Sequence, residues 1–348
     1  MMSRAAAATQ QTKSQAYRFI DAYLAGQWKH ARLFFGQMER NWGPVGSTGL
    51  SIANQGYPRT DLAFEVVFRD LQFTAIGTQL TAMRSNDGTI HQRYFVAHRL
   101  NARLSSRLNL ALWETAVMSG TNRSFEPGFA NPLILFCFLI HQGMKDDRNT
   151  ILGGDLSWRP AHRVLLQGQA MIDDRWRRKP DPTGTGEPAH PGRRAATMVG
   201  SDALGSRLGW RAHLAIVSTL AYRTLDNAQN FVDNGLGIGP QFPDHLSLGV
   251  SVGVPVSKSW LVAPDLTLFQ QGEGRYDQPF PLGVALTATP DLFLGAVEST
   301  WRLGARASGG VGPFQFLGEG GWHHTTTRNR FEARLRATVG FQTQKALQ

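Results

Sequence analysis

A strict alternation of apolar and polar side chains marks residues 331–341. The apolar positions are the odd ones, Phe331, Ala333, Leu335, Ala337, Val339 and Phe341. The polar positions are the even ones, Glu332, Arg334, Arg336, Thr338 and Gly340. Because successive side chains on a β-strand point to opposite faces of the sheet, this pattern predicts a strand with one apolar face and one charged face.

The same alternation recurs along the chain. It is clear over residues 61–69, 93–104, 151–159, 162–174, 207–223, 246–254 and 293–306, and weaker over residues 17–27, 30–38, 260–270 and 314–322. Return strands of hairpins are expected at residues 71–83 and 108–118. Repeated short segments with dyad alternation are typical of barrels whose outer face meets lipid and whose interior is polar. The sequence therefore predicts an all-β fold, a transmembrane antiparallel β-barrel of about 14 strands, an even number as in bacterial barrels.

The segments between the predicted strands alternate in length, as barrel turns do. Short turns fall near residues 69–70, 105–106, 160–161 and 257–258, and long connections span residues 42–60, 120–149, 175–204 and 226–245. In outer-membrane barrels the short turns are periplasmic and the long loops extracellular. We expect the basic, Pro- and Gly-rich loop at residues 175–204 to be exposed and mobile. Residues 131–142 are a candidate for a short helix against or inside the barrel.

The predicted barrel fills residues 15–342, between a disordered or non-native N-terminus at residues 1–14 and a C-terminal tail at residues 343–348. Residues 1–15 contain no apolar core of the length that a secretion signal requires. An exported barrel needs such a signal. We therefore expect the sequence to be a fragment that lacks the signal peptide and some upstream strands.

Composition is compatible with this fold. Hydrophobic residues are 42% of the chain, and the mean hydropathy is -0.25, values that a barrel shares with soluble proteins because half of each strand faces polar surroundings. The longest apolar stretch, residues 132–140, is far shorter than the ~20 residues of a membrane-spanning helix. The single cysteine, Cys137, lies in that stretch, forms no intrachain disulfide and is expected to serve packing.

The basic charge is carried mainly by arginine. The formal net charge is +10, and six of the 36 basic residues are lysines, at positions 13, 29, 145, 179, 258 and 345. The arginines are spread over strand faces rather than clustered in one helix or tail, which argues against a nucleic-acid partner. Arginine favours planar contact with carboxylate and phosphate groups, so anionic sugars and lipid headgroups suit this chain better.

Three motifs with catalytic or metal-binding chemistry do not fit their required context. Residues 249–253 match G-x-S-x-G, but the alternation runs straight through Ser251, and no helix follows to form a nucleophile elbow. His323 and His324 have no carboxylate or cysteine at ligand spacing. Asp173 and Asp174 point to opposite faces of a strand, and their distance from Glu114 cannot be read from sequence. We expect neither enzyme activity nor a metal or cofactor.

The strongest functional pattern is a set of arginines on the predicted inner faces. Its members are Arg99, Arg103, Arg159, Arg163, Arg207, Arg211, Arg302, Arg306, Arg334 and Arg336. In a structural reading they pair with Glu65, Asp155, Asp173, Glu298 and Glu332 and brace the wall. In a functional reading some of them bind an anionic glycan. Tryptophans at 113, 158, 210, 260, 301 and 322 suit interfacial girdles or packing better than sugar stacking.

Several motifs resemble the capsule assembly Wzi family of outer-membrane proteins. They lie at residues 36–44, 97–99, 112–114, 125–127, 131–133, 152–155, 168–169, 173–174, 235–237, 242–244 and 271–274. The likeness runs from about residue 27 to about residue 306. At its start we expect the chain to depart from the family, lacking the signal, the helical elements and the first strands. It also departs at its end, where residues 342–348 follow Phe341 instead of a terminal aromatic residue.

The resemblance implies an eighteen-stranded barrel with a periplasmic helical bundle, and a lectin-like role in holding capsular polysaccharide. About four further strands would raise the predicted fourteen to that number. On this basis we predict a monomer in the bacterial outer membrane, in contact with lipid and lipopolysaccharide, whose partner is an anionic surface polysaccharide. The expected ligand-binding residues are Trp42, Arg99, Arg103, Trp113, Glu114, Asp155, Arg163 and Asp173. The alternative is a porin-like channel selective for small anionic solutes.

Overall fold

The computed structural model describes residues 22–54, 59–125, 148–173, 192–202 and 209–339. Fifteen strands form one antiparallel sheet, and each strand pairs with its neighbour in chain order. The strands are β1 (Ala22–Gln27), β2 (Ala31–Met38), β3 (Arg59–Phe68), β4 (Leu71–Arg84), β5 (Ile90–Arg103), β6 (Leu108–Gly120), β7 (Arg148–Ala161), β8 (Val164–Asp173), β9 (Arg194–Asp202), β10 (Gly209–Val217), β13 (His245–Pro255), β14 (Trp260–Gln271), β15 (Glu298–Val311), β16 (Phe314–Thr325) and β17 (Asn329–Val339).

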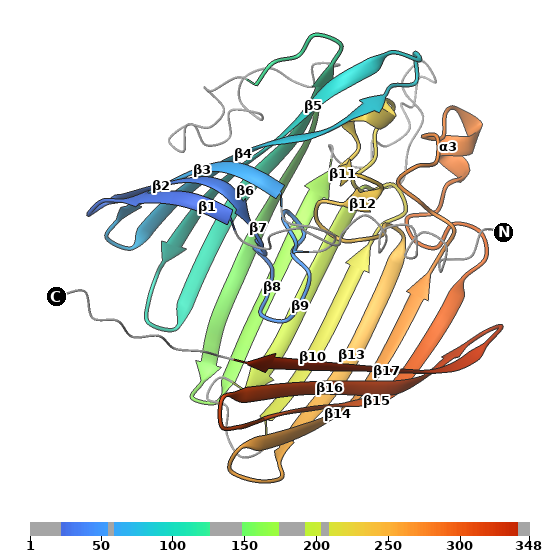
Figure 1. The fold of residues 1–348 in the computed structure, drawn as a ribbon. Helices are drawn as coiled ribbons and strands as arrows, with labels where there is room; N and C mark the ends of the chain where they lie inside the picture. Colours follow the sequence, from blue (N-terminus) through green and yellow to red (C-terminus); the bar gives the residue numbers. More distant parts are fainter. Residues whose placement is uncertain (1–21, 55–58, 126–147, 174–191, 203–208, 340–348) are drawn as a thin grey trace.

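The sheet curls around an interior (Figure 1), with β1 and β17 at its two ends. Among the described residues no backbone ladder joins these two strands, so the wall is curved and open there. Two short strands, β11 (Val232–Asp233) and β12 (Leu236–Gly237), pair separately. A 3₁₀ turn, η2 (Asn227–Gln229), and a short helix, α3 (Val284–Ala288), lie in the connections. The all-β antiparallel fold predicted from the alternation is confirmed.

The outer face of the wall carries the apolar half of the alternation. Leu248, Val250, Val252 and Val254 follow each other at every second position of β13 and are all exposed. On β17, Phe331 is 65% exposed and Leu335 is 76% exposed. Soluble monomers rarely expose apolar surface on this scale, whereas a lipid-facing barrel wall requires it.

The structure corrects the sequence prediction at several places. The sheet has fifteen strands where about 14 were predicted, and the strand predicted at 293–306 begins at Glu298. Residues 194–202, which the prediction placed in the long loop at 175–204, form β9 and pair with β8 and β10. The predicted strand at 207–223 stops at Val217, and the residues beyond it turn inward. Leu220 and Tyr222 continue the apolar alternation there because they are buried in the interior, and Tyr222 adopts a left-handed backbone conformation with φ 68°.

Some predicted features lie outside the described residues. These are the N-terminus at 1–14, the candidate helix at 131–142 with Cys137, the basic part of the loop up to residue 191, and the tail at 343–348. Within the described part of the chain, no helix has the length and apolar character needed to cross a membrane.

The hydrophobic core lies on the concave side, between the wall and two long connections. We call these connections, residues 39–54 and 218–244, the inner loops. Leu50 and Ile52 from the first loop, and Tyr222, Phe231 and Ile238 from the second, pack in one cluster with wall residues that include Phe95, Trp113, Val117 and Ile151. Burial of one such side chain contributes about 1.5–3 kcal/mol. The inner loops are thus an integral part of the fold.

Candidate functional site

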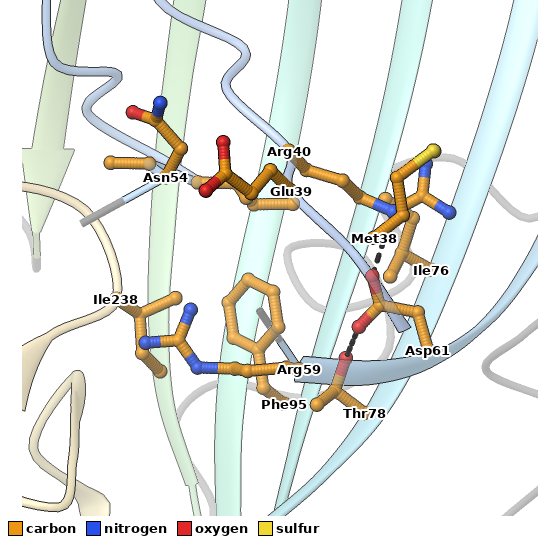
Figure 2. Close-up of a pocket in the computed structure, with 12 residues that line it drawn as sticks. Met38, Glu39, Arg40, Asn54, Arg59, Asp61, Ile76, Thr78, Phe95 and Ile238 are labelled. Carbon is orange, nitrogen blue, oxygen red and sulfur yellow. Dashed lines mark hydrogen bonds and ion pairs between the residues drawn. The ribbon is translucent and has the colours of Figure 1, made fainter. Parts of the chain in front are cut away.

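The first inner loop joins the wall at β3 through a buried carboxylate. Asp61 accepts a hydrogen bond of 2.7 Å from Arg40 Nε and one of 2.5 Å from Thr78 Oγ1 (Figure 2). Arg59 Nε lies 3.4 Å from Asp233 Oδ2 in the second inner loop, and Asp233 Oδ1 also accepts from Thr81 N at 3.0 Å. These contacts hold both loops against β3 and β4.

Four of the predicted site residues meet at a second anchor on β5 to β7. Arg99 Nη2 lies 2.5 Å from Asp155 Oδ2, and Trp113 Nε1 donates to Asp155 Oδ1 at 2.8 Å. The guanidinium of Arg99 lies over the ring of Trp42, with its central carbon 5.4 Å from the ring centre. Asp155 is therefore shared between a cation and two neutral donors, one of which is the amide of Gln169.

Gln169, which the sequence prediction did not include among the site residues, connects this anchor to the first inner loop. Its Nε2 donates to Asp155 Oδ1 at 2.6 Å and to the carbonyl of Trp42 at 2.7 Å. Its Oε1 accepts from Leu50 N at 2.8 Å. The only sequence signal was its place in the motif at residues 168–169, because a lone glutamine carries no catalytic or charge signature.

Gly153 allows Trp113 to lie flat on the wall. A Cβ at Gly153 would come within 2.2 Å of the Trp113 ring, so only glycine fits beside the indole. Trp113 itself is completely buried. The indole is therefore a packing and anchoring group in this conformation, with its ring unavailable for stacking on a sugar.

Two of the predicted acids are separated by the wall. Asp173, at the end of β8, is fully buried, accepts a 2.5 Å hydrogen bond from Tyr222 N and lies 4.0 Å from Arg193 Nη1. Glu114 is on the opposite face of β6 from Trp113, where its Oε1 lies 2.9 Å from His98 Nδ1 and both side chains are buried. The structure does not bring these acids together as a catalytic pair.

Arg103 and Arg163 lie at the other end of the wall, beside the short turns. Arg103 Nη2 is 2.8 Å from Asp70 Oδ1, and Arg163 Nη2 is 3.2 Å from Asp202 Oδ2. Their side chains are 67% and 55% exposed. The eight predicted residues thus fall into an inner anchor, two separate buried acids and two exposed arginines at the short-turn end.

Tyr222 and Asp244 organise the second inner loop. Tyr222 Oη donates to Leu50 O at 2.9 Å, which ties the two inner loops together. Burial raises the pKa of the Tyr222 hydroxyl, so it remains a neutral donor. Asp244 accepts from Thr219 Oγ1, Gly274 N, Phe293 N and Leu294 N at 2.6–3.0 Å. This contact brings the segments at 242–244 and 271–274 together in space.

A polar cavity of about 710 Å³ lies between the inner loops and the wall at β9, β10 and β13 to β15. Its charged and titratable lining consists of Arg211, Arg306, His213 and His245. Among the described residues that line it there is no aspartate or glutamate. Sequence reasoning had placed both arginines on the inner face but did not bring them together, because β10 and β15 are far apart in the chain.

No cluster of three or more His, Cys, Asp or Glu side chains suitable for a metal ion occurs in the described ranges. The arrangement of the concave side is therefore one of hydrogen-bond anchors and a cationic cavity. Such a surface can hold an anionic or hydroxyl-rich molecule through charge-assisted hydrogen bonds.

The comparisons with known proteins agree with the resemblance found in the sequence. The family model for capsule assembly protein Wzi matches residues 2–166, which confirms that resemblance for the N-terminal part of the chain. No curated protein sequence matches the chain at a significant level.

Among solved structures, the Escherichia coli outer-membrane protein Wzi, a carbohydrate-binding β-barrel involved in group 1 capsule assembly, matches with a TM-score of 0.61 and 12% identity. The match covers 91% of this chain and 68% of that one. OprD from Pseudomonas aeruginosa matches with a TM-score of 0.45 and 11% identity, over 91% of this chain and 78% of OprD. The first likeness shows that the fold is that of an outer-membrane β-barrel, and the second supports no inference.

Proposed function

We propose that this Wzi-like chain is a non-enzymatic outer-membrane β-barrel that binds or organises an anionic surface polysaccharide. The observation that carries the proposal is the concave side, where inner loops cover the wall and leave a cationic cavity without a carboxylate in its described lining. The exposed apolar outer face supports a position in the membrane, with the short turns toward the periplasm and the long connections toward the cell surface.

The anchored loops favour glycan binding over free passage of solutes. The first inner loop is hydrogen-bonded to wall residues Asp61, Gln167 and Gln169, and the second packs on Phe95 and Trp113. An open porin needs an unobstructed water-filled lumen, whereas these loops fill part of the interior with apolar side chains. The porin-like channel for anionic solutes remains the second candidate, since both functions would use inward arginines.

The predicted site residues divide this function between two ends of the barrel. Trp42, Arg99, Trp113 and Asp155 would position the first inner loop, with Arg99 offering its remaining donors to the glycan. Glu114 and Asp173 would support the wall and the second inner loop. Arg103 and Arg163 lie exposed at the short-turn end, which would face the periplasm, so they would meet acidic groups of the polysaccharide only on that side of the membrane.

Replacement of Arg99, Arg103 and Arg163 together by glutamine tests these arginines. We expect weaker retention of acidic polysaccharide on the cell surface, with normal abundance of the heat-modifiable barrel in the outer membrane. Lys258→Gln, in an exposed short turn, is the control for a lost positive charge. Unchanged retention would reject the three arginines as binding residues.

Conductance across a planar bilayer separates the two candidate functions. A glycan-binding barrel with filled interior should give no steady current. A steady anion-selective current would favour the channel instead.

A further inference from the structure

The cavity beside β10 contains an arginine whose charge is not compensated by a carboxylate. Arg211 Nη2 donates to Gly46 O at 2.5 Å, and Arg211 Nη1 lies 3.5 Å from His213 Nδ1. Its Nε is buried without a hydrogen-bond partner. Among the described residues the charged group that acts on Arg211 is another arginine, Arg306, and not a carboxylate. Arg211 is half-buried, and partial burial of a guanidinium without an anion carries a desolvation cost, so this position points to a ligand.

A second guanidinium, that of Arg306 on β15, lines the same cavity. Its carboxylate partner is Glu319 on β16, with Nη2 at 3.3 Å from Oε2. Glu319 is also approached by Arg334 Nη1 at 3.8 Å, so one acid serves two arginines. Arg302 pairs with Asp265 and leaves no further acid for the cavity from β14. The interior at β10 and β15 therefore keeps an excess of positive charge.

The remaining lining suits a sugar rather than an inorganic ion alone. Hydroxyl and amide groups of Asn41, Ser47, Thr197 and Ser247 line the cavity, and Phe269 adds an aromatic ring. The volume of about 710 Å³ falls within the range of small-molecule sites, roughly 300–1,000 Å³. Carboxylate groups on hydroxylated rings would satisfy guanidinium, hydroxyl and ring contacts together.

His213 is built into the wall at this cavity. A Cβ at Gly249 would lie 2.2 Å from His213 Cε1, so the glycine lets the imidazole lie against β13. His213 Nε2 lies 3.2 Å from Ser247 Oγ. The first glycine of the G-x-S-x-G motif thus has a packing role, and the ring stays beside Arg211 at the cavity.

We propose that the cavity lined by Arg211, His213 and Arg306 is a binding site for the carboxylate-bearing residues of an acidic glycan. This inference rests on the proposed function and names the part of the barrel that recognises the charge of its polysaccharide. The two guanidinium groups bind the carboxylates, and the hydroxyl and amide groups bind the ring oxygens. A neutral glycan of the same length lacks the charge-assisted contacts and binds more weakly.

Binding of trigalacturonate and of neutral maltotriose to the purified full chain in detergent tests the proposal. We expect the double variant Arg211→Gln with Arg306→Gln to bind trigalacturonate roughly ten- to a hundredfold more weakly, the effect of losing charge-assisted hydrogen bonds. The control variant Arg107→Gln with Lys258→Gln removes two positive charges from exposed short turns and should bind like the unchanged chain. Heat-modifiable migration shows that each variant is folded.

A label in the cavity gives a second readout that does not depend on the arginines. In the variant Ser47→Cys with Cys137→Ser, trigalacturonate should slow maleimide labelling of the new thiol, while maltotriose should not. If the chain binds trigalacturonate but the double variant binds it equally and the label is not protected, the cavity proposal is wrong and the proposed function stands. If the unchanged chain binds neither acidic nor neutral glycans, the proposed function itself fails.

Discussion

Strands β6 and β17 belong to the same antiparallel wall but have opposite surroundings in the structure. Every residue of β6 from Trp113 to Ser119 is buried, so both faces of the strand are covered there. Every residue of β17 is exposed. The wall is built by the same pairing rules in both places. The inner loops cover one face of β6, where Trp113 and Val117 join the core, and a separate cluster with Val96 and Phe125 buries Ala116 and Met118 on the other face, whereas β17 has neither cover. Alternation therefore specifies a two-faced wall, and the long connections decide which parts of it become a packed interior.

The same contrast separates two kinds of charged contact. Asp155, near β6, has a side chain 11% exposed and shares three partners. Glu332, on β17, is 51% exposed and pairs with Arg330 Nη2 at 2.8 Å and with His323 Nε2 at 3.5 Å. The first contact is a structural anchor, and the second is an ordinary solvent-screened ion pair.

The largest expected effect is a difference in the free energy of unfolding between variants of these two acids. Asp155→Asn leaves Arg99 with an uncompensated charge and should lower the free energy of unfolding by about 3 kcal/mol. Glu332→Gln should lower it by less than about 1 kcal/mol. Urea unfolding of the detergent-solubilised barrel, followed by tryptophan fluorescence, measures both. If both variants lost the same free energy of unfolding, Asp155 would be no stronger an anchor than the exposed Glu332.

A smaller effect is expected at two glycines of the wall. Gly153→Ala places a methyl group against the buried Trp113 ring and should cost about 2 kcal/mol, the range of overpacked cores. Gly318→Ala on β16 meets only Leu335 Cδ1 at 3.8 Å, an ordinary contact, and should change stability by about 0.5 kcal/mol or less. The same unfolding experiment compares them. A harmless Gly153→Ala would show that the indole can move off the wall.

Most of the wall could be predicted from the sequence, because the period of two is a property of each strand alone. β9 was missed because its outward side chains include Ala196 and Gly200, whose small size weakens the apolar signal. The strand predicted over β10 extends too far because Leu220 and Tyr222 are apolar for a different reason: they belong to the second inner loop and are buried in the interior. Local pattern cannot distinguish a lipid-facing side chain from one that packs in an interior.

The site could be predicted only where its residues share neighbouring strands. Arg99, Trp113 and Asp155 lie on β5, β6 and β7, so strand adjacency brings them together. Arg211 and Arg306 meet across strands that are distant in sequence, and Gln169 and Asp244 act through backbone groups of loops. Such contacts depend on how the sheet curls and how the loops fold, which no single segment encodes.

We infer that successive side chains along the wall of this chain alternate between a lipid-facing side and a polar side. Nitroxide labels placed one at a time at positions 331–339 of the barrel in lipid bilayers test it most directly, through collision rates with oxygen and with a water-soluble nickel complex. We expect high oxygen accessibility at the odd positions and high accessibility to the nickel complex at the even ones, with a period of two. Uniform access of the nickel complex to all nine positions would contradict a membrane-spanning wall.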